Sequence, residues 1–134
     1  MSLKIELKAE ERFILGNAVI TNGESRTKLY IEGDTPLLRE VDIMRPEEAD
    51  TPCKKIYLLV QLLYLAEDPT IHHDTYFAMV HDVQNAAPST AGHFERINNS
   101  LLTGTPYKAL KAAKLLISHE KELMEHAGRP SSLL

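Results

Sequence analysis

The single cysteine, Cys53, is the side chain whose type and position come nearest to nucleophilic chemistry. It lies in the first turn of a predicted helix beside Lys54 and Lys55, and both a helix N-terminus and neighbouring cations lower the pKa of a thiol. However, no histidine is close to it in the sequence to act as a base, and a lone cysteine in a helix usually behaves as a small apolar residue. We therefore favour a structural role for Cys53 over a reactive thiolate.

The six histidines do not have the spacing of a metal site. His72 and His73 are adjacent and point to different sides of a helix, and His81 is more than two turns beyond His73. The sequence has neither an H-E-x-x-H motif nor a pair of histidines at i and i+4, and its glycines form no phosphate-binding loop. We expect hydrogen-bonded or surface histidines, no metal, no cofactor and no enzymatic activity.

The basic residues indicate binding rather than catalysis. Lysines and arginines on a sheet can hold phosphates while nearby polar edges and backbone read bases, and the predicted strands and turns carry Lys4, Lys8, Arg26, Lys28 and Arg39. A possible second basic surface lies on the last predicted helix, where the side opposite the apolar stripe carries Tyr107, Lys111, Lys114 and Lys121. The ordinary alternative is that these lysines only keep half-exposed strands and helices soluble.

The predicted secondary structure that positions these groups changes once along the chain, from strands to helices. Residues 3–43 have the pattern of short strands, with apolar and polar residues alternating over 3–7. Further strands are predicted at 12–15, 18–21, 27–32 and 37–43. The turns between them are marked by Gly16-Asn17, Asn22-Gly23 and Gly33-Asp34-Thr35-Pro36.

From residue 46 onward the pattern is helical. A central helix is predicted at 52–66, with Thr51 as N-cap and Pro52 as its first residue. Its apolar run, 56–66, belongs in a core and is too short to cross a bilayer, which needs about 20 residues. A second helix follows, a third is capped by Ser89 or Thr90, and a fourth is capped by Thr105. The fourth helix is predicted to bury Leu110, Ala113, Leu116, Ile117 and Met124.

The predicted fold class is therefore α+β. A small antiparallel β lobe over 1–45 precedes a bundle of about four helices over 46–128, and 129–134 form a flexible tail. A β lobe of about 40 residues is marginal by itself, so it should pack on the helices or on a second copy of itself. The open edge of the strand at 3–7 favours a homo-oligomer formed by strand pairing.

The net charge and the cysteine content limit the classes of partner and the cellular compartment that are expected. The formal net charge of −4 gives no global field for nucleic acid or an anionic membrane, so any site for a polyanion must be local. One cysteine excludes an internal disulfide and fits a reducing compartment. The charged opening MSLKIELKAEERF is not a signal peptide, which predicts a cytoplasmic protein without a membrane partner.

Three segments resemble a known family. They are LKIELKAEERFILGNAVITNG, IEGDTPLLREVDIMRPEEADTPCKKIYLLVQLLYL and YKALKAAKLLISHEKEL, and the most specific part is LLRE-x-DIM followed by TP-x-x-x-IY. The sequence is similar here to FlbT, the flagellar biosynthesis repressor of flagellated bacteria. The resemblance implies a post-transcriptional regulator that acts on the untranslated leader of flagellin messenger RNA and couples flagellin synthesis to flagellar assembly. It also implies a protein partner, the small protein FlaF.

The β lobe has a second, weaker likeness. The order of strands and turns is similar to that of the small RNA-binding carbon storage regulator CsrA in three segments, ERFILGNAVI, LYIEGDTP and LLREVDI. In that family the first strand of one chain and the last strand of its dimer mate grip RNA, which would point to Lys8 and Arg39. Where that family has adjacent arginines this chain has Leu7-Lys8, which would remove the grip, weaken it, or shift it to Lys4 and Arg12.

These patterns lead to two hypotheses. In the first, the protein represses or destabilises flagellin messages by binding their leader, without catalysing a reaction, through Lys4, Lys8, Arg12, Arg26, Lys28 and Arg39. In the alternative, it is a chaperone or scaffold that binds flagellin or the FlaF partner through its helices and has no direct RNA contact. The alternative predicts an exposed apolar groove on the helical part and binding that depends little on salt.

Overall fold

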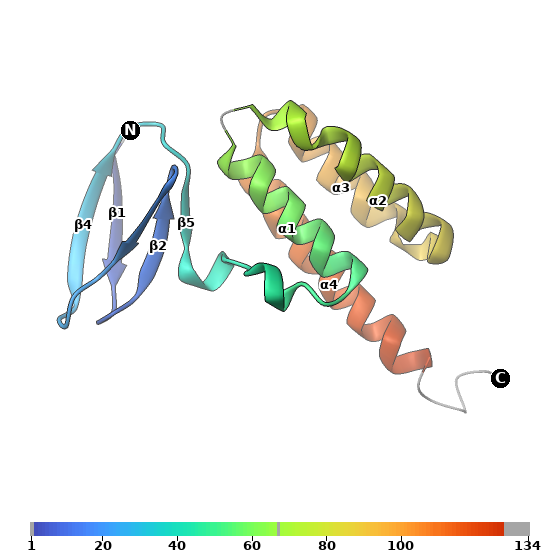
Figure 1. Cartoon of the computed structure of the whole chain (residues 1–134), viewed down its shortest axis with the longest axis horizontal. Coiled ribbons are helices and arrows are strands. Elements are labelled where there is room, and N and C mark those ends of the chain that lie inside the picture. Colours follow the sequence, from blue (N-terminus) through green and yellow to red (C-terminus); the bar gives the residue numbers. More distant parts are fainter. Residues whose placement is uncertain (1, 67, 128–134) are drawn as a thin grey trace. The chain divides into compact units, whose positions relative to one another are not determined.

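A computed structural model gives the protein an α+β fold and describes residues 2–66 and 68–127. The strands come first and the helices follow, as the sequence predicts (Figure 1). The chain forms two compact units that divide between Ile43 and Met44, here termed the β unit and the helical unit. The predicted flexible tail, 129–134, lies outside the described residues.

The β unit contains two small antiparallel sheets. Its strands are β1 (Ser2–Leu7), β2 (Arg12–Leu15), β3 (Ala18–Thr21), β4 (Thr27–Glu32) and β5 (Leu37–Arg39). One sheet consists of β1 and β4, and the other has the order β3-β2-β5. Figure 1 shows β4 beside β1 and β5 beside β2, although β4 and β1 are far apart in the sequence.

The alternation of apolar residues buries one face of each sheet. On β1, Ile5 and Leu7 are 3% and 1% exposed, and Phe13 on β2 is 1% exposed. These three side chains form one apolar cluster, against which partly buried side chains from both sheets pack: Leu15, Ile20, Leu29, Ile31 and Leu37. Because side chains in a strand alternate between faces, this shared core forces the intervening polar residues outward.

Gly16 and Glu10 each place a left-handed backbone in a turn of the β unit. Gly16, in the loop between β2 and β3, has φ 62°, and a Cβ there would lie 2.8 Å from Cγ2 of Thr35. This confirms the turn predicted from Gly16-Asn17. Glu10, between β1 and β2, has φ 63°, which is uncommon for a residue with a Cβ, and its N–H donates to the carbonyl oxygen of Gly23 at 2.8 Å.

The last strand is shorter than the predicted 37–43. It ends at Arg39, which pairs with Phe13, because the chain leaves the strand conformation at Glu40. The chain then forms a 3₁₀ turn, η1 (Glu40–Asp42), in which the N–H of Ile43 donates to the carbonyl oxygen of Glu40 at 3.1 Å.

The helical unit places its first long helix at the centre. α1 (Pro52–Leu65) packs against α4 (Pro106–Ala127) and α2 (His73–Ala86), and α3 (Ala91–Leu102) packs against α4. The 3₁₀ turns η2 (Pro46–Glu48), η3 (Pro69–His72) and η4 (Pro88–Thr90) precede α1, α2 and α3. Among the described helices, none has the length and apolar character needed to cross a membrane.

The buried side of α1 includes a polar residue, Gln61. Ile56 and Val60 are 0% exposed, as expected for the core, but Leu62 is 40% exposed while Gln61 is only 6% exposed. The Gln61 side chain accepts a hydrogen bond from the N–H of Met44 at 2.8 Å and donates one to the carbonyl oxygen of Met44 at 3.1 Å. Gln61 therefore supplies hydrogen-bond partners for the N–H and carbonyl oxygen of Met44, a residue outside the helices and strands.

Two predictions for the later helices are wrong. Thr90 occupies the N-cap position of α3, but its hydroxyl donates to the carbonyl oxygen of Ala87 at 2.7 Å and does not cap the helix. Met124 is 58% exposed, although Leu116 is buried. Its exposure follows from its position, because Glu120 lies at the first turn of α1 and Met124 is one turn of α4 beyond it.

The N-terminus of α1 is held by a carboxylate from α4. One Glu120 oxygen accepts from the Thr51 hydroxyl, and the other accepts from the N–H of Cys53 at 2.9 Å. The Thr51 hydroxyl in turn accepts from the N–H of Lys54 at 3.3 Å, which confirms Thr51 as the N-cap. An anion at this end of a helix is favourable, because the first N–H groups have no partner within the helix and carry partial positive charge.

We expect Glu120→Gln to lower the free energy of unfolding by about 1 kcal/mol, because the variant removes the negative charge from the end of α1. Urea unfolding followed by circular dichroism measures the change. Glu122→Gln removes a charge from an exposed position of the same helix and is the matched control. Equal unfolding free energies for the two variants would contradict a capping role for Glu120.

Candidate nucleic-acid interface

The outer side of the β1–β4 sheet carries the polar residues that alternate with its core. The register places Lys4 opposite Tyr30 and Glu6 opposite Lys28. All four side chains are exposed, and they are termed here the β1/β4 face. This face therefore combines two cations, one carboxylate and one aromatic ring on a regular strand pair.

The charged side chains of the β1/β4 face form only a weak ion pair, between Lys4 and Glu6. Lys4 Nζ lies 3.9 Å from Glu6 Oε1, and the two side chains are 50% and 54% exposed. Ion pairs between such exposed groups contribute little to stability, because water and salt screen them. Lys4 can therefore exchange this partner for a phosphate at small cost.

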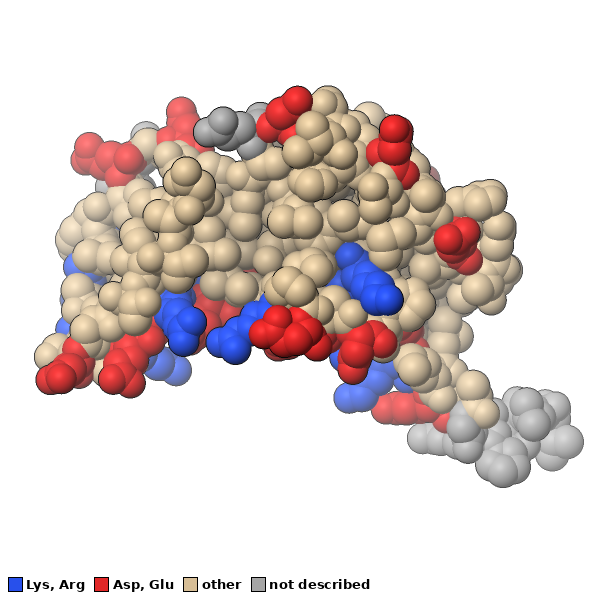
Figure 2. Space-filling model, in the orientation of Figure 1, with Lys and Arg blue, Asp and Glu red and all other residues tan. Residues whose placement is uncertain are grey.

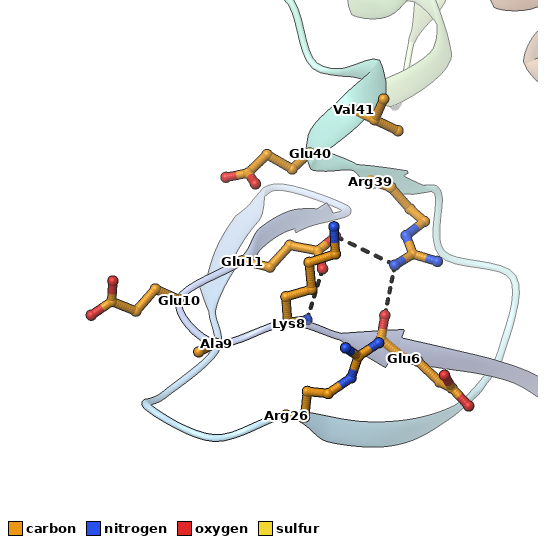
Figure 3. A pocket seen from close by; sticks show the side chains of 9 residues that line it. All are labelled: Glu6, Lys8, Ala9, Glu10, Glu11, Arg26, Arg39, Glu40 and Val41. Atoms are coloured by element: carbon orange, nitrogen blue, oxygen red, sulfur yellow. Dashed lines mark hydrogen bonds and ion pairs between the residues drawn. The ribbon is translucent and has the colours of Figure 1, made fainter.

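An open hollow of about 670 Å³ lies at the end of β1, next to the β1/β4 face (Figure 3). Lys8, Arg26 and Arg39 supply its basic side chains, and Glu6 belongs to both the hollow and the β1/β4 face. A smaller hollow of about 150 Å³ joins the two regions, because it is lined by Glu6, Arg26, Thr27 and Lys28. Lys8 and Arg26 therefore extend the basic side of the sheet beyond the ends of its strands.

Arg39 is tied into this hollow by contacts within the protein. Its Nη2 donates to the carbonyl oxygen of Glu6 at 2.7 Å and to Glu11 Oε2 at 3.3 Å (Figure 3). Glu11 Oε1 accepts from the N–H of Lys8 at 2.9 Å. The pKa of Glu11 is lowered, first by the Lys8 N–H and then by Arg39, while burial acts in the opposite direction. Arg39 thus positions the end of β1 in addition to contributing charge.

The hollow as a whole is not basic. Four carboxylates face three basic side chains, and the carboxylates belong to Glu6, Glu10, Glu11 and Glu40. On the face of the molecule drawn in Figure 2, Lys and Arg are likewise interspersed with Asp and Glu. Attraction of a polyanion must therefore come from a few placed cations rather than from a broad basic field.

The structure separates the six predicted binding residues into groups. Lys4 and Lys28 project from the β1/β4 face, and Lys8, Arg26 and Arg39 line the hollow beside it. Arg12 is exposed on β2, on the side of that strand opposite the buried Phe13. Because Phe13 faces the core between the sheets, Arg12 projects from the face of the β3-β2-β5 sheet that is turned away from this core.

The predicted second basic surface lies on α4. Lys111 Nζ is 5.2 Å from the centre of the Tyr107 ring, in a cation–π contact. Lys111 and Lys121 are exposed, and Lys114 is half-buried. Tyr107 also lies near Tyr64 of α1, with ring centroids 6.2 Å apart, so this ring is part of helix packing.

Sequence reasoning missed the exposed aromatic residue of the β1/β4 face. Tyr30 is 69% exposed, whereas its neighbours Leu29 and Ile31 pack against the core. The signal that could have identified it is the alternation within TKLYIE, which assigns Lys28, Tyr30 and Glu32 to one face of the strand.

The structure places Cys53 in the buried first turn of α1 and brings two of the histidines together on α3 and α4. Burial, and then the hydrogen bond and charge of Glu120, raise the pKa of the Cys53 thiol to about 12. The rings of His93 and His119 lie 4.8 Å apart, and His119 Nε2 is 2.9 Å from the Ser89 hydroxyl. Within the described residues, no three His, Cys, Asp or Glu side chains are grouped so that they could hold a metal ion.

Comparison with known proteins gives consistent matches along the chain. A family model described as flagellar protein FlbT matches residues 3–124. A probable flagellum biosynthesis repressor protein FlbT 1 from Bradyrhizobium diazoefficiens is 51% identical over 92% of this chain and 85% of its own length. A probable repressor of the same name from Rhodopseudomonas palustris is 44% identical over 92% of this chain and 98% of its own length.

A more distant relative has the same name. The flagellum biosynthesis repressor protein FlbT of Caulobacter vibrioides is 31% identical over 96% of this chain and 93% of its own length. No solved structure matches the chain at a significant level. The matches therefore span both units.

We expect the stability that Glu11 contributes to depend on pH. Its pKa is lower in the folded protein than its ordinary value of 4.5, so the contribution is present above that value and is lost as pH falls through the folded pKa. Glu11→Gln should therefore be less stable than the native protein at pH 7, and the gap should narrow below about pH 4.5. Urea unfolding at several pH values measures the gap, with Glu10→Gln as control, and a constant gap down to pH 3 would contradict the assignment.

We expect the Cys53 thiol to be unreactive in the folded protein. With a pKa of about 12, it is protonated at pH 8, and alkylation by iodoacetamide should be roughly a hundred-fold or more slower than in the urea-unfolded chain. Glu120→Gln should speed the reaction, because the carboxylate helps to raise this pKa. Equal alkylation rates in the folded and unfolded protein, followed by mass spectrometry, would restore the reactive-thiolate interpretation.

Proposed function

Because the chain belongs to the FlbT family, we propose that it is a post-transcriptional repressor that binds the untranslated leader of flagellin messenger RNA in the cytoplasm and couples flagellin synthesis to flagellar assembly. It acts without catalysing a reaction and lowers translation or lifetime of the message. The names of its relatives, flagellum biosynthesis repressors, support the regulatory part of this proposal.

The observation that carries the RNA-binding part is the clustering of cations along one side of the β unit. Lys4 and Lys28 lie on the β1/β4 face, and Lys8 and Arg26 line the hollow next to it. A sheet presents such side chains at fixed spacing, so several phosphates of one strand of RNA can be held at once. Arg12 contacts RNA only if the leader passes around the β unit or reaches a second protomer.

Assembly into a homo-oligomer would enlarge this surface. In the described part of the β unit, β1 and β4 pair as strands only with each other, so each has one edge without a strand partner, although Arg39 already binds the carbonyl oxygen of Glu6 on β1. Open edges favour strand pairing between identical chains, and a two-fold arrangement would bring two β1/β4 faces to one RNA. We propose such a dimer as the RNA-binding form.

A second candidate function rests on the helical unit. A hollow of about 200 Å³ at the first turn of α1 has a mainly apolar lining that includes Val83, Ala86 and Leu123. Phe77 and Leu115 are 55% and 53% exposed elsewhere on this unit. These features support binding of a protein partner, either FlaF or flagellin, by which the message would be affected only indirectly.

We expect affinity for a flagellin leader transcript to fall about fifty-fold between 50 and 200 mM salt, if about four phosphates are neutralised on single-stranded RNA. Lys4→Gln combined with Lys28→Gln should weaken binding on the order of ten-fold and reduce the salt dependence by about half, because two of these contacts are removed. Lys111→Gln combined with Lys121→Gln makes the same charge change on α4 and should leave binding unchanged.

Filter binding or fluorescence anisotropy across the salt series gives both quantities. The same purified protein is tested against flagellin and the FlaF-like protein. Binding to these proteins with no binding to the leader transcript would reject direct RNA recognition and favour the scaffold function. Equal losses in the two double variants would reject the β1/β4 face as the site.

A further inference from the structure

The β1/β4 face carries an exposed aromatic ring, Tyr30, which the attraction of phosphates by lysines does not require. Its ring projects from the β1/β4 face with 69% of its surface exposed, directly opposite Lys4. Lys28 lies two residues away on the same strand and the same face, at a distance of about 7 Å along the strand. The ring is thus flanked by two cations on a regular strand pair.

This combination matches the chemistry of an unpaired nucleotide. The flat face of a base stacks on an aromatic ring, while the phosphates on either side carry the charge that lysines attract. A single exposed aromatic residue is ordinary on a protein surface, but here the cations on both sides supply the complementary charge. A protein partner would gain less, because Glu6 and the two lysines leave no continuous apolar area around Tyr30.

We propose that Tyr30 stacks on an unpaired base of single-stranded RNA while Lys4 and Lys28 hold the phosphates next to that base. This inference rests on the proposed function and adds to it the form of RNA that is recognised. The Tyr30 ring cannot reach the face of a base inside a duplex, because the base pairs stacked above and below that base cover both of its faces. The protein should therefore select unpaired segments of a leader and bind poorly where the leader is folded into helices.

The test uses one RNA in two forms. A 12-nucleotide segment of the flagellin leader is measured as a single strand and again after annealing to its complement. Native protein should bind the single strand at least ten-fold more tightly than the duplex. Equal affinity for the two forms would overturn stacking as the basis of recognition.

Substitutions at Tyr30 separate stacking from charge. Tyr30→Phe keeps the ring and should bind within about two-fold of the native protein, whereas Tyr30→Val keeps the strand preference and should bind about ten-fold or more weakly. The salt dependence of Tyr30→Val should be unchanged, because no cation is removed. Thermal unfolding of both variants shows whether the β unit remains folded.

A direct spectroscopic reading is available because the protein contains no tryptophan. Tyr30→Trp introduces the only tryptophan of the chain on the β1/β4 face, and the tryptophan emission should be quenched by the single strand and unaffected by the duplex. If native protein binds the single strand but Tyr30→Val binds equally well and Tyr30→Trp is not quenched, the stacking proposal fails and RNA binding stands. If native protein binds neither RNA, both proposals fail.

Discussion

A sheet of only two strands is at best marginally stable in water unless one of its faces is buried, and the β unit depends on this constraint. The inner face of the β1–β4 sheet is covered by the second sheet, with Ile5, Leu7 and Phe13 at the centre of the shared core. Burial on this scale stabilises by about 2 kcal/mol for each large apolar side chain. A shift of either strand by one residue would turn these side chains to water, so the register is fixed by the core.

The same constraint determines what the protein offers to a ligand. Once the core fixes the register, Lys4, Lys28 and Tyr30 must project from the opposite face. The hollow at the end of β1 is shaped by hydrogen bonds instead. Arg39 of the last strand binds the carbonyl oxygen of Glu6 on the first strand and the carboxylate of Glu11. The interface proposed for RNA is therefore a consequence of packing, with its charged groups positioned by strand alternation rather than by a mobile loop.

The sequence predicted the strand and helix order well, because alternation and helical caps are local signals. The sequence was less informative where contacts with residues far away in the chain determine burial. Leu62 is exposed and Gln61 is buried in the most apolar helix, because Gln61 pairs with the backbone of Met44. The last strand ends at Arg39 because a 3₁₀ turn begins at Glu40, which the alternation of residues 37–43 did not reveal. Five of the six predicted basic residues lie on or beside the β1/β4 face, whereas the charge pattern alone could not show that Arg12 points from the other side.

Localising the RNA on the protein surface is the most direct test of the central claim. ¹⁵N-labelled protein can be titrated with a single-stranded segment of the flagellin leader while the backbone amide signals are followed by nuclear magnetic resonance. We expect the largest shifts at residues 3–8 and 26–32, with small changes along 107–121. Large shifts along α4 or the other helices, with the signals of β1 and β4 unchanged, would contradict RNA recognition by the β1/β4 face.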